Sequence, residues 1–359
     1  MSTAAGASLA APATEASVSP IKTLFPGYFA LVMATGIISI AASQQSIDWL
    51  AQALYAVAAT GYTVLTVMLT LRIVLYPRAF IADVQTHTKG FAFLTTVAGT
   101  NVLASASAIV HGWWALAWVL WWVSLGLWAF FLYATLISTV VRGNKPALGG
   151  GINGTWFLLT VSTQSIVVVG GLVFDRHPSD TLAFALLAAF LVGIVLYLIV
   201  MTMVFLRWTF HELEPTEVDP PAWIAAGAVA ITVLAGSNLL IAAPDSERLT
   251  RLAGFVEGMT VLAWATATFW FPLMIAIGVW RHGVRRVPLR YHPSYWSLVF
   301  PIGMYSAATY RMRAAIDLES LEVLPKLALA GAIVAWSATA IGLGHQGITS
   351  LLTRRSNDP

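Results

Sequence analysis

The sequence contains no cysteine and few charged residues. With no Cys among 359 residues, disulfide bonds, thiolate nucleophiles and cysteine metal ligands are excluded. Only 10% of the residues are Asp, Glu, Lys or Arg, whereas soluble domains carry about 25%. Hydrophobic residues make up 58% of the chain. This composition predicts an all-α integral membrane protein with the lipid bilayer as its surroundings.

Several other function classes lack the patterns they need. The basic residues flank apolar runs instead of forming a patch, so the net charge of +3 does not predict nucleic acid binding. Two glycine triplets, in 149–154 and 342–347, match a dinucleotide pattern, but neither lies between a strand and a helix. No two histidines are spaced as in a zinc hydrolase, and no carboxylates pair within an apolar run. We therefore expect no catalytic residues, no metal site and no cofactor; a membrane-embedded enzyme remains a remote alternative.

Runs without a charged residue predict the number of membrane spans. They cover residues 23–47, 49–71, 90–141, 146–174, 181–206, 220–244, 258–280, 291–310 and 327–353. The run 90–141 would be about 78 Å long as one helix, against a hydrocarbon core of about 30 Å, so it must turn, and His111-Gly112 is the natural place. Ten spans result. We expect a disordered tail at 1–22, a transmembrane domain at 23–353 and a short cytoplasmic tail at 354–359.

The distribution of Lys and Arg predicts the orientation of these spans. If the N-terminus is cytoplasmic, 13 of the 19 basic residues fall in inner segments and 6 in outer segments. Basic residues accumulate on the cytoplasmic side of membrane proteins. We therefore expect a multi-pass protein of the cell membrane with both termini in the cytoplasm. Arg311 is counted among the outer residues, directly after the run 291–310.

The ten spans alternate in the size and polarity of their side chains. Odd spans contain small residues and residues with hydroxyl or amide groups, as in 95–107. Even spans contain large apolar and aromatic residues, as in the tryptophan-rich segment 113–128. Small residues let helices approach closely, and polar side chains in membranes face the bundle interior. Bulky aromatic residues suit the lipid face. The pattern predicts five hairpins, with odd helices lining a central pore and even helices facing lipid.

The segment 291–310 has the most distinctive span sequence, because a proline lies at its middle. Pro301 has no N–H to donate within the helix, and its ring crowds the preceding turn, so a kink is expected. In lipid, such a break needs protein or water to satisfy the freed carbonyl. Phe300 stands directly at the break, and Gly303 follows it. A phenylalanine in a membrane helix commonly packs against a neighbour, but this position also suits a gate.

Two segments carry a resemblance to a known family. Residues 295–309 (YWSLVFPIGMYSAAT) and 25–39 (FPGYFALVMATGIIS) resemble the ninth and first helices of the tellurite-resistance/dicarboxylate transporter family. This family includes the bacterial protein TehA, the yeast malate permease, fungal sulfite exporters and plant slow anion channels. The resemblance implies a homotrimer in which each subunit has its own pore of five inner helices. It also implies that Phe300, with Pro301, plugs that pore.

Together these observations predict a channel-like path for small anions in the bilayer, such as a C4-dicarboxylate, sulfite, tellurite or an inorganic anion. The candidate pore-lining residues are Thr35, Gly36, Asn101, Gln164, Asn238 and Gly303. His87 and Lys89 would lie at a positive cytoplasmic mouth, which concentrates anions. The alternative is a proton-coupled C4-dicarboxylate (malate) transporter that uses a histidine or Glu257. We expect Glu257 instead to lie at the water-exposed end of its helix, because Arg251, only six residues away, marks the membrane surface.

Overall fold

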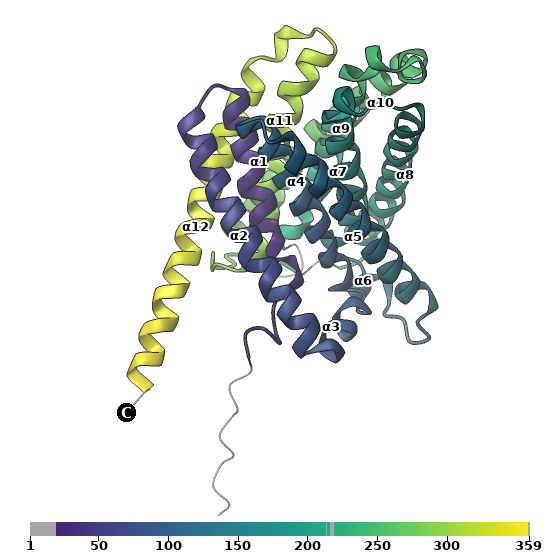
Figure 1. Ribbon diagram of the computed structural model, residues 1–359. Coiled ribbons are helices and arrows are strands. Elements are labelled where there is room, and N and C mark those ends of the chain that lie inside the picture. Colours follow the sequence, from purple (N-terminus) through teal and green to yellow (C-terminus); the bar gives the residue numbers. More distant parts are fainter. Residues whose placement is uncertain (1–18, 213, 216–218, 358–359) are drawn as a thin grey trace, which may run out of the picture.

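The computed structural model describes residues 19–212, 214–215 and 219–357, and within them the chain is helical without any strand (Figure 1). Its long helices fall into two sets by burial. In the candidate membrane windows of four helices, 83–89% of the residues are buried, against 17–33% in five others. A further helix, α11, has thirteen of its twenty residues buried and belongs with the first set.

The buried, inner set is α1 (Ala30–Gln44), α4 (Leu94–His111), α7 (Leu158–Leu172), α9 (Ile224–Ile241) and α11 (Trp296–Ala315). The outer set is α2 (Asp48–Leu75), α5 (Trp114–Val141), α8 (Asp180–Phe210), α10 (Glu247–Val279) and α12 (Val323–Asn357). Two short helices, α3 (Pro77–Val84) and α6 (Leu148–Gly151), lie in connections. Figure 1 shows α12 and α8 on opposite sides of the molecule, with α1 and α4 between them.

The inner helices form a closed ring. In order, α1 packs on α4, α4 on α7, α7 on α9, α9 on α11, and α11 on α1 again. Each inner helix also packs on the outer helix that follows it in the chain, giving the pairs α1–α2, α4–α5, α7–α8, α9–α10 and α11–α12. The short turns that precede the five inner helices also contact one another in this order, so all five helices run in the same direction around one axis.

Glycine lets the ring close tightly. A Cβ atom at Gly36 of α1 would lie 2.6 Å from Cγ1 of Val102 on α4, and one at Gly303 of α11 would lie 2.9 Å from Cγ2 of Ile37 on α1. Both distances are shorter than real Cβ contacts, so a side chain at either position would displace the neighbouring helix or its side chain, and glycine permits the close approach. Within the ring, Gly36 and Gly303 thus serve packing between neighbouring helices.

The observed spans can be compared with the predicted ones. Gly112 has a φ of +69° and ends α4, so the long run 90–141 turns where expected. Among the described residues, nine helices are long and apolar enough to cross a membrane. Helix α11 is not among them, since it contains Arg311, Arg313 and several hydroxyl residues. The count of ten spans stays a prediction. Helix α12 continues past residue 353, and residues 1–18 and 358–359 of the predicted tails lie outside the described residues.

Candidate functional site

The inner helices all begin with a short 3₁₀ turn, and these turns form a second ring. The turns are Pro26–Phe29, Gly90–Phe93, Gly154–Phe157, Pro220–Trp223 and Pro293–Tyr295, and each contacts the next in the order of the helices. Each turn opens on proline or glycine. Proline suits a helix start because its missing N–H would have no intrahelical acceptor there. Glycine at 154 is required, because a Cβ there would lie 2.1 Å from the Pro221 carbonyl oxygen of the neighbouring turn.

Five helix N-termini therefore meet at one end of the ring, here called the N-terminal end. Each helix N-terminus carries about half a positive elementary charge from its aligned peptide dipoles. No Asp or Glu occurs in the five inner helices, all of which lie within the described residues, and their only Lys or Arg residues are Arg311 and Arg313. At the N-terminal end the helix dipoles, with no acidic side chain in the inner helices to oppose them, favour negative ions over positive ones.

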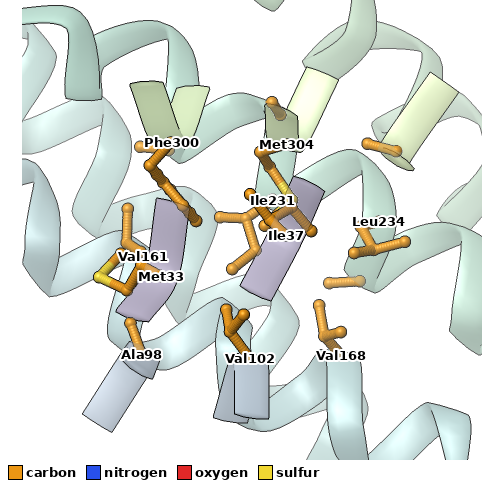
Figure 2. Packing of buried hydrophobic residues seen from close by; sticks show 14 of the residues in the cluster. Met33, Ile37, Ala98, Val102, Val161, Val168, Ile231, Leu234, Phe300 and Met304 are labelled. Carbon is orange, nitrogen blue, oxygen red and sulfur yellow. The ribbon is translucent and has the colours of Figure 1, made fainter. Parts of the chain in front are cut away.

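Apolar side chains close the ring near this end. Phe300 is only 1% exposed and belongs to the same buried cluster as Met33 of α1, Ala98 of α4 and Val161 of α7. Figure 2 shows the Phe300 side chain reaching from α11 toward Met33 and Val161. On α9 the facing residue is Gly227, where a Cβ would lie 3.4 Å from the Phe300 ring and 2.9 Å from Pro301 Cγ. The absence of a side chain at 227 makes room for the phenylalanine.

One turn further along the axis the ring encloses a small cavity. Its lining comes from all five inner helices: Ile37, Ile40, Asn101, Val102, Ser105, Ser165, Val168, Ile231, Leu234 and Met304. The volume is about 10 Å³, close to the space needed for one water molecule. Met304 follows Phe300 by four residues, so both side chains lie on the same face of α11. Two successive apolar layers, at Phe300 and at Met304, thus obstruct the axis (Figure 2).

Polar groups follow at the other end of the ring, here called the C-terminal end. Asn238 of α9 donates from Nδ2 to the Val168 carbonyl of α7 at 2.9 Å. Its Oδ1 accepts a hydrogen bond from Nε of Arg311 on α11, also at 2.9 Å. Asn238 and Arg311 follow the cavity residues Ile231 and Met304 by seven residues each, which keeps them on the same helix faces. Of the predicted lining residues, Asn101 and Asn238 lie at or beside the cavity.

Two other predicted lining residues bind outer helices. Thr35 Oγ1 accepts from Trp336 Nε1 of α12 at 2.9 Å, and Gln164 Nε2 donates to the Phe190 carbonyl of α8 at 3.0 Å. These side chains are directed toward the outer helices that cover α1 and α7. Asn101 of α4 links its helix to α7 and α5. Its Nδ2 donates to Ser165 Oγ of α7 at 2.8 Å, and its Oδ1 accepts from Ser124 Oγ of α5 at 2.6 Å.

The predicted mouth residues lie in the connection before α4, beside the ring of turns. His87 is 8% exposed, and its ring lies 6.4 Å from that of Trp156. Burial and the positive charges of Arg142 and Lys145 lower the pKa of His87, so it is neutral at pH 7. Lys89 is half-exposed and pairs with Asp83 at 3.2 Å. Neither His87 nor Lys89 therefore supplies an unpaired positive charge at the predicted mouth.

Some residues of the site were not identified from the sequence. Met304, Ile37 and Ile231 were passed over because they are apolar, and Arg311 because it follows the end of a charge-free run. Met304 lies four residues after Phe300, and Arg311 lies seven residues after Met304, so helical spacing from Phe300 would have found both. Glu257 lies on the exposed surface of the outer helix α10, outside the ring. The described residues contain no cluster of His, Asp or Glu that could hold a metal ion.

Comparison with known proteins identifies the family. A family model described as SLAC1, voltage-dependent anion channel, matches residues 23–343, which is most of the chain. The chain belongs to the SLAC1 family. This confirms the resemblance of the first and ninth spans to the family of tellurite-resistance and slow anion channel proteins.

Several known proteins are similar in sequence to this chain. It is 23% identical over 324 residues to a sulfite efflux pump of Arthroderma otae, covering 81% of this chain and 82% of that protein. It is 23% identical over 310 residues to an uncharacterized transporter of Methanocaldococcus jannaschii, covering 83% and 86%. An uncharacterized membrane protein of Mycobacterium tuberculosis is 37% identical over 150 residues, covering 42% and 76%. These names point to transporters and not to enzymes.

Proposed function

We propose that this SLAC1-family protein conducts small anions along the axis of its five-helix ring. The observation that carries this proposal is the electrostatic character of the ring. Five helix N-termini converge at one end, and the inner helices contain no acidic residue. Half-helix and helix N-termini attract anionic substrates in the same way in transporters built from broken helices.

Phe300 is the gate in this proposal, and Pro301 holds the backbone next to it. An aromatic side chain across a narrow pore excludes water, and a hydrophobic constriction blocks ions by dewetting. The Met304 layer lengthens the obstruction by one turn. Because the cavity beside Met304 has room for about one water molecule, the axis suits small inorganic anions such as sulfite, nitrate or chloride better than a C4-dicarboxylate. Tellurite belongs to the same class of small inorganic anions.

Transport is uncoupled from protons in this proposal. A proton-coupled carrier needs an ionisable group that changes its charge within the translocation path. The inner helices supply no carboxylate, and Glu257 stands on the outer surface of α10. A proton-coupled dicarboxylate carrier, which would use a histidine such as His87 or else Glu257, is therefore the second candidate.

We further propose that α11 completes ten spans arranged as five hairpins, with the N-terminal end of the ring in the cytoplasm. The bias of Lys and Arg supports this orientation. The cell membrane as location and a homotrimeric assembly follow from the family resemblance. Reporter fusions after residues 112, 178 and 318 should report outside, and fusions after 85, 145 and 287 inside. A consistent inversion would contradict the proposed orientation.

The function is tested with purified protein in lipid vesicles. Vesicles loaded with chloride or nitrate should release the anion down its gradient, at a rate that does not depend on a pH gradient. A rate that collapses without an opposing proton gradient would favour the carrier. Protein-free vesicles and vesicles with a Phe300→Ala variant supply the lower and upper references.

A further inference from the structure

Arg311 is a cation at the C-terminal end of the ring axis. It lies on α11 in the same stripe as Phe300 and Met304, at a spacing of four and then seven residues. Its side chain reaches across to α9, where Nε donates to Asn238 Oδ1 at 2.9 Å. Asn238 is held in turn by its bond to the Val168 carbonyl of α7. Three of the five inner helices thus fix the position of this guanidinium group.

The guanidinium has no counter-charge within the described part of the chain. The ion pairs of the described residues join other groups, and no carboxylate oxygen lies within 4.0 Å of Arg311. Its only hydrogen bond is the one from Nε, so the two terminal nitrogens donate to no protein group there. These nitrogens are also not among the fully buried unsatisfied atoms, which means that solvent reaches them. By contrast, the buried Arg72 pairs with Asp83.

Further unsatisfied polar atoms lie along the same axis. Ser105 of α4 is 3% exposed, lines the cavity next to Met304, and its Oγ has no hydrogen-bond partner within the described residues. Gln44 of α1 follows Ile37 by seven residues, and its Oε1 is buried without a partner there. A buried polar group without a partner costs stability unless water or a ligand satisfies it. Ser105 thus lines the cavity itself, and Gln44 lies on the face of α1 that carries the cavity residues Ile37 and Ile40.

We propose that Arg311, positioned by Asn238, binds a small oxyanion at the C-terminal end of the ring, before or after the anion passes the Phe300 gate. A partly buried cation without a carboxylate is stabilised by an anion of its own. Because Nε is engaged, the two terminal nitrogens are left for the ligand. They form a planar fork that matches two oxygens of nitrate, sulfite or a carboxylate better than it matches a spherical halide.

The role of this site in transport rests on the proposed function, but binding can be measured without transport. Purified full-length protein in detergent is titrated with sodium nitrate or sodium chloride at constant ionic strength, and the dissociation constant is taken from the rise in Tm with anion concentration. Arg311→Gln should weaken nitrate binding about ten- to a hundredfold, the size expected for a lost hydrogen-bonded charge. Arg313→Gln is the matched control, because Arg313 follows two residues later on another face of α11. It should change nitrate binding less than about twofold.

Arg311→Lys tests the fork. Lysine keeps the charge but cannot donate two parallel hydrogen bonds, so it should lose the preference for nitrate over chloride. The lysine variant also decides the question if Arg311→Gln does not fold. Folded Arg311→Gln protein that binds nitrate like the wild type would overturn the proposal, as would an equal loss in Arg313→Gln or an unchanged preference in Arg311→Lys.

Transport assays separate this proposal from the proposed function. If Arg311→Gln loses nitrate binding but Phe300→Ala vesicles pass no anion, the binding site stands and anion conduction fails. If Phe300→Ala vesicles pass nitrate and Arg311→Gln binds it normally, conduction stands and this site fails. With both proposals correct, the external nitrate concentration for half-maximal flux should rise in Arg311→Gln by the same factor as the dissociation constant.

Discussion

Replacing Phe300 with alanine is the most informative perturbation of the proposed gate. The side chain is 1% exposed and packs in the same cluster as Met33 and Val161. Truncating a packed phenylalanine costs about 3–5 kcal/mol. If opening requires the side chain to leave this packing, the same energy holds the gate closed. With about 1.4 kcal/mol for each factor of ten, Phe300→Ala should raise anion conductance about 10²- to 10⁴-fold. The Met304 layer remains in this variant, so the lower part of that range is expected.

The assay is anion current from purified protein in planar bilayers, together with Tm in detergent. Phe190→Ala is the matched control, because Phe190 is 0% exposed but lies on the outer helix α8. Both alanine variants should lower Tm by a similar amount, since both remove a buried ring. Only Phe300→Ala should raise the current. Phe300→Leu should fall between wild type and Phe300→Ala, and Phe300→Ala with Met304→Ala should exceed the single variant.

The current of the Phe300→Ala protein decides whether Phe300 is the gate. If Phe300→Ala loses as much thermal stability as Phe190→Ala and its current is no larger than that of the wild type, Phe300 is a packing residue. The obstruction would then lie elsewhere on the axis. An equal rise in current in both variants would instead indicate a general loosening of the helix bundle.

Three further predictions concern groups outside the ring axis. Glu257→Gln should leave both the anion flux and its pH dependence unchanged, because this side chain is on the surface of α10; loss of the pH dependence would indicate proton coupling. Burial, partly offset by the charge of Arg281, raises the pKa of Asp219 to about 6 from the 3.8 of an exposed carboxyl. The folded protein thus holds this proton more tightly than the unfolded chain, so stability falls as pH rises through 4 to 6. Tm should rise when pH is lowered from 7 to 5, and Asp219→Asn should reduce that rise; identical profiles would contradict it. Arg72→Met should cost about 1–3 kcal/mol of unfolding free energy, since it removes the buried partner of Asp83 and leaves that carboxylate only the exposed Lys89, whereas the exposed Arg78→Met should cost little.

The separation into inner and outer helices could be predicted from side-chain size. A ring of five helices around one axis requires close approach on both sides of each helix, and only small residues such as Gly36 and Gly303 allow it. The turn at Gly112 could be predicted from the length of the run that contains it, because one bilayer cannot hold so long a helix. These features depend on side-chain volume and on the length of apolar runs, and both can be read from the sequence.

The direction of individual polar side chains could not be predicted in this way. Thr35 and Gln164 lie on inner helices but bind Trp336 and the Phe190 carbonyl on outer helices. In lipid, a polar group is satisfied by any helix within reach, so polarity alone does not indicate the axis. Arg311 was counted with the outer segment that follows the run 291–310, because a charge ends an apolar run, yet it lies four residues before the end of α11. The partner on α9 that holds it is 73 residues away in the chain.

Anion conduction along the five-helix ring is tested most directly by the reversal potential of Phe300→Ala protein in a planar bilayer. With a tenfold sodium nitrate gradient at equal pH on both sides, the current should reverse close to the Nernst potential of nitrate, and a pH gradient added afterwards should not move it. A reversal at the Nernst potential of sodium, a reversal that follows the pH gradient, or no current above that of the protein-free bilayer would contradict the account.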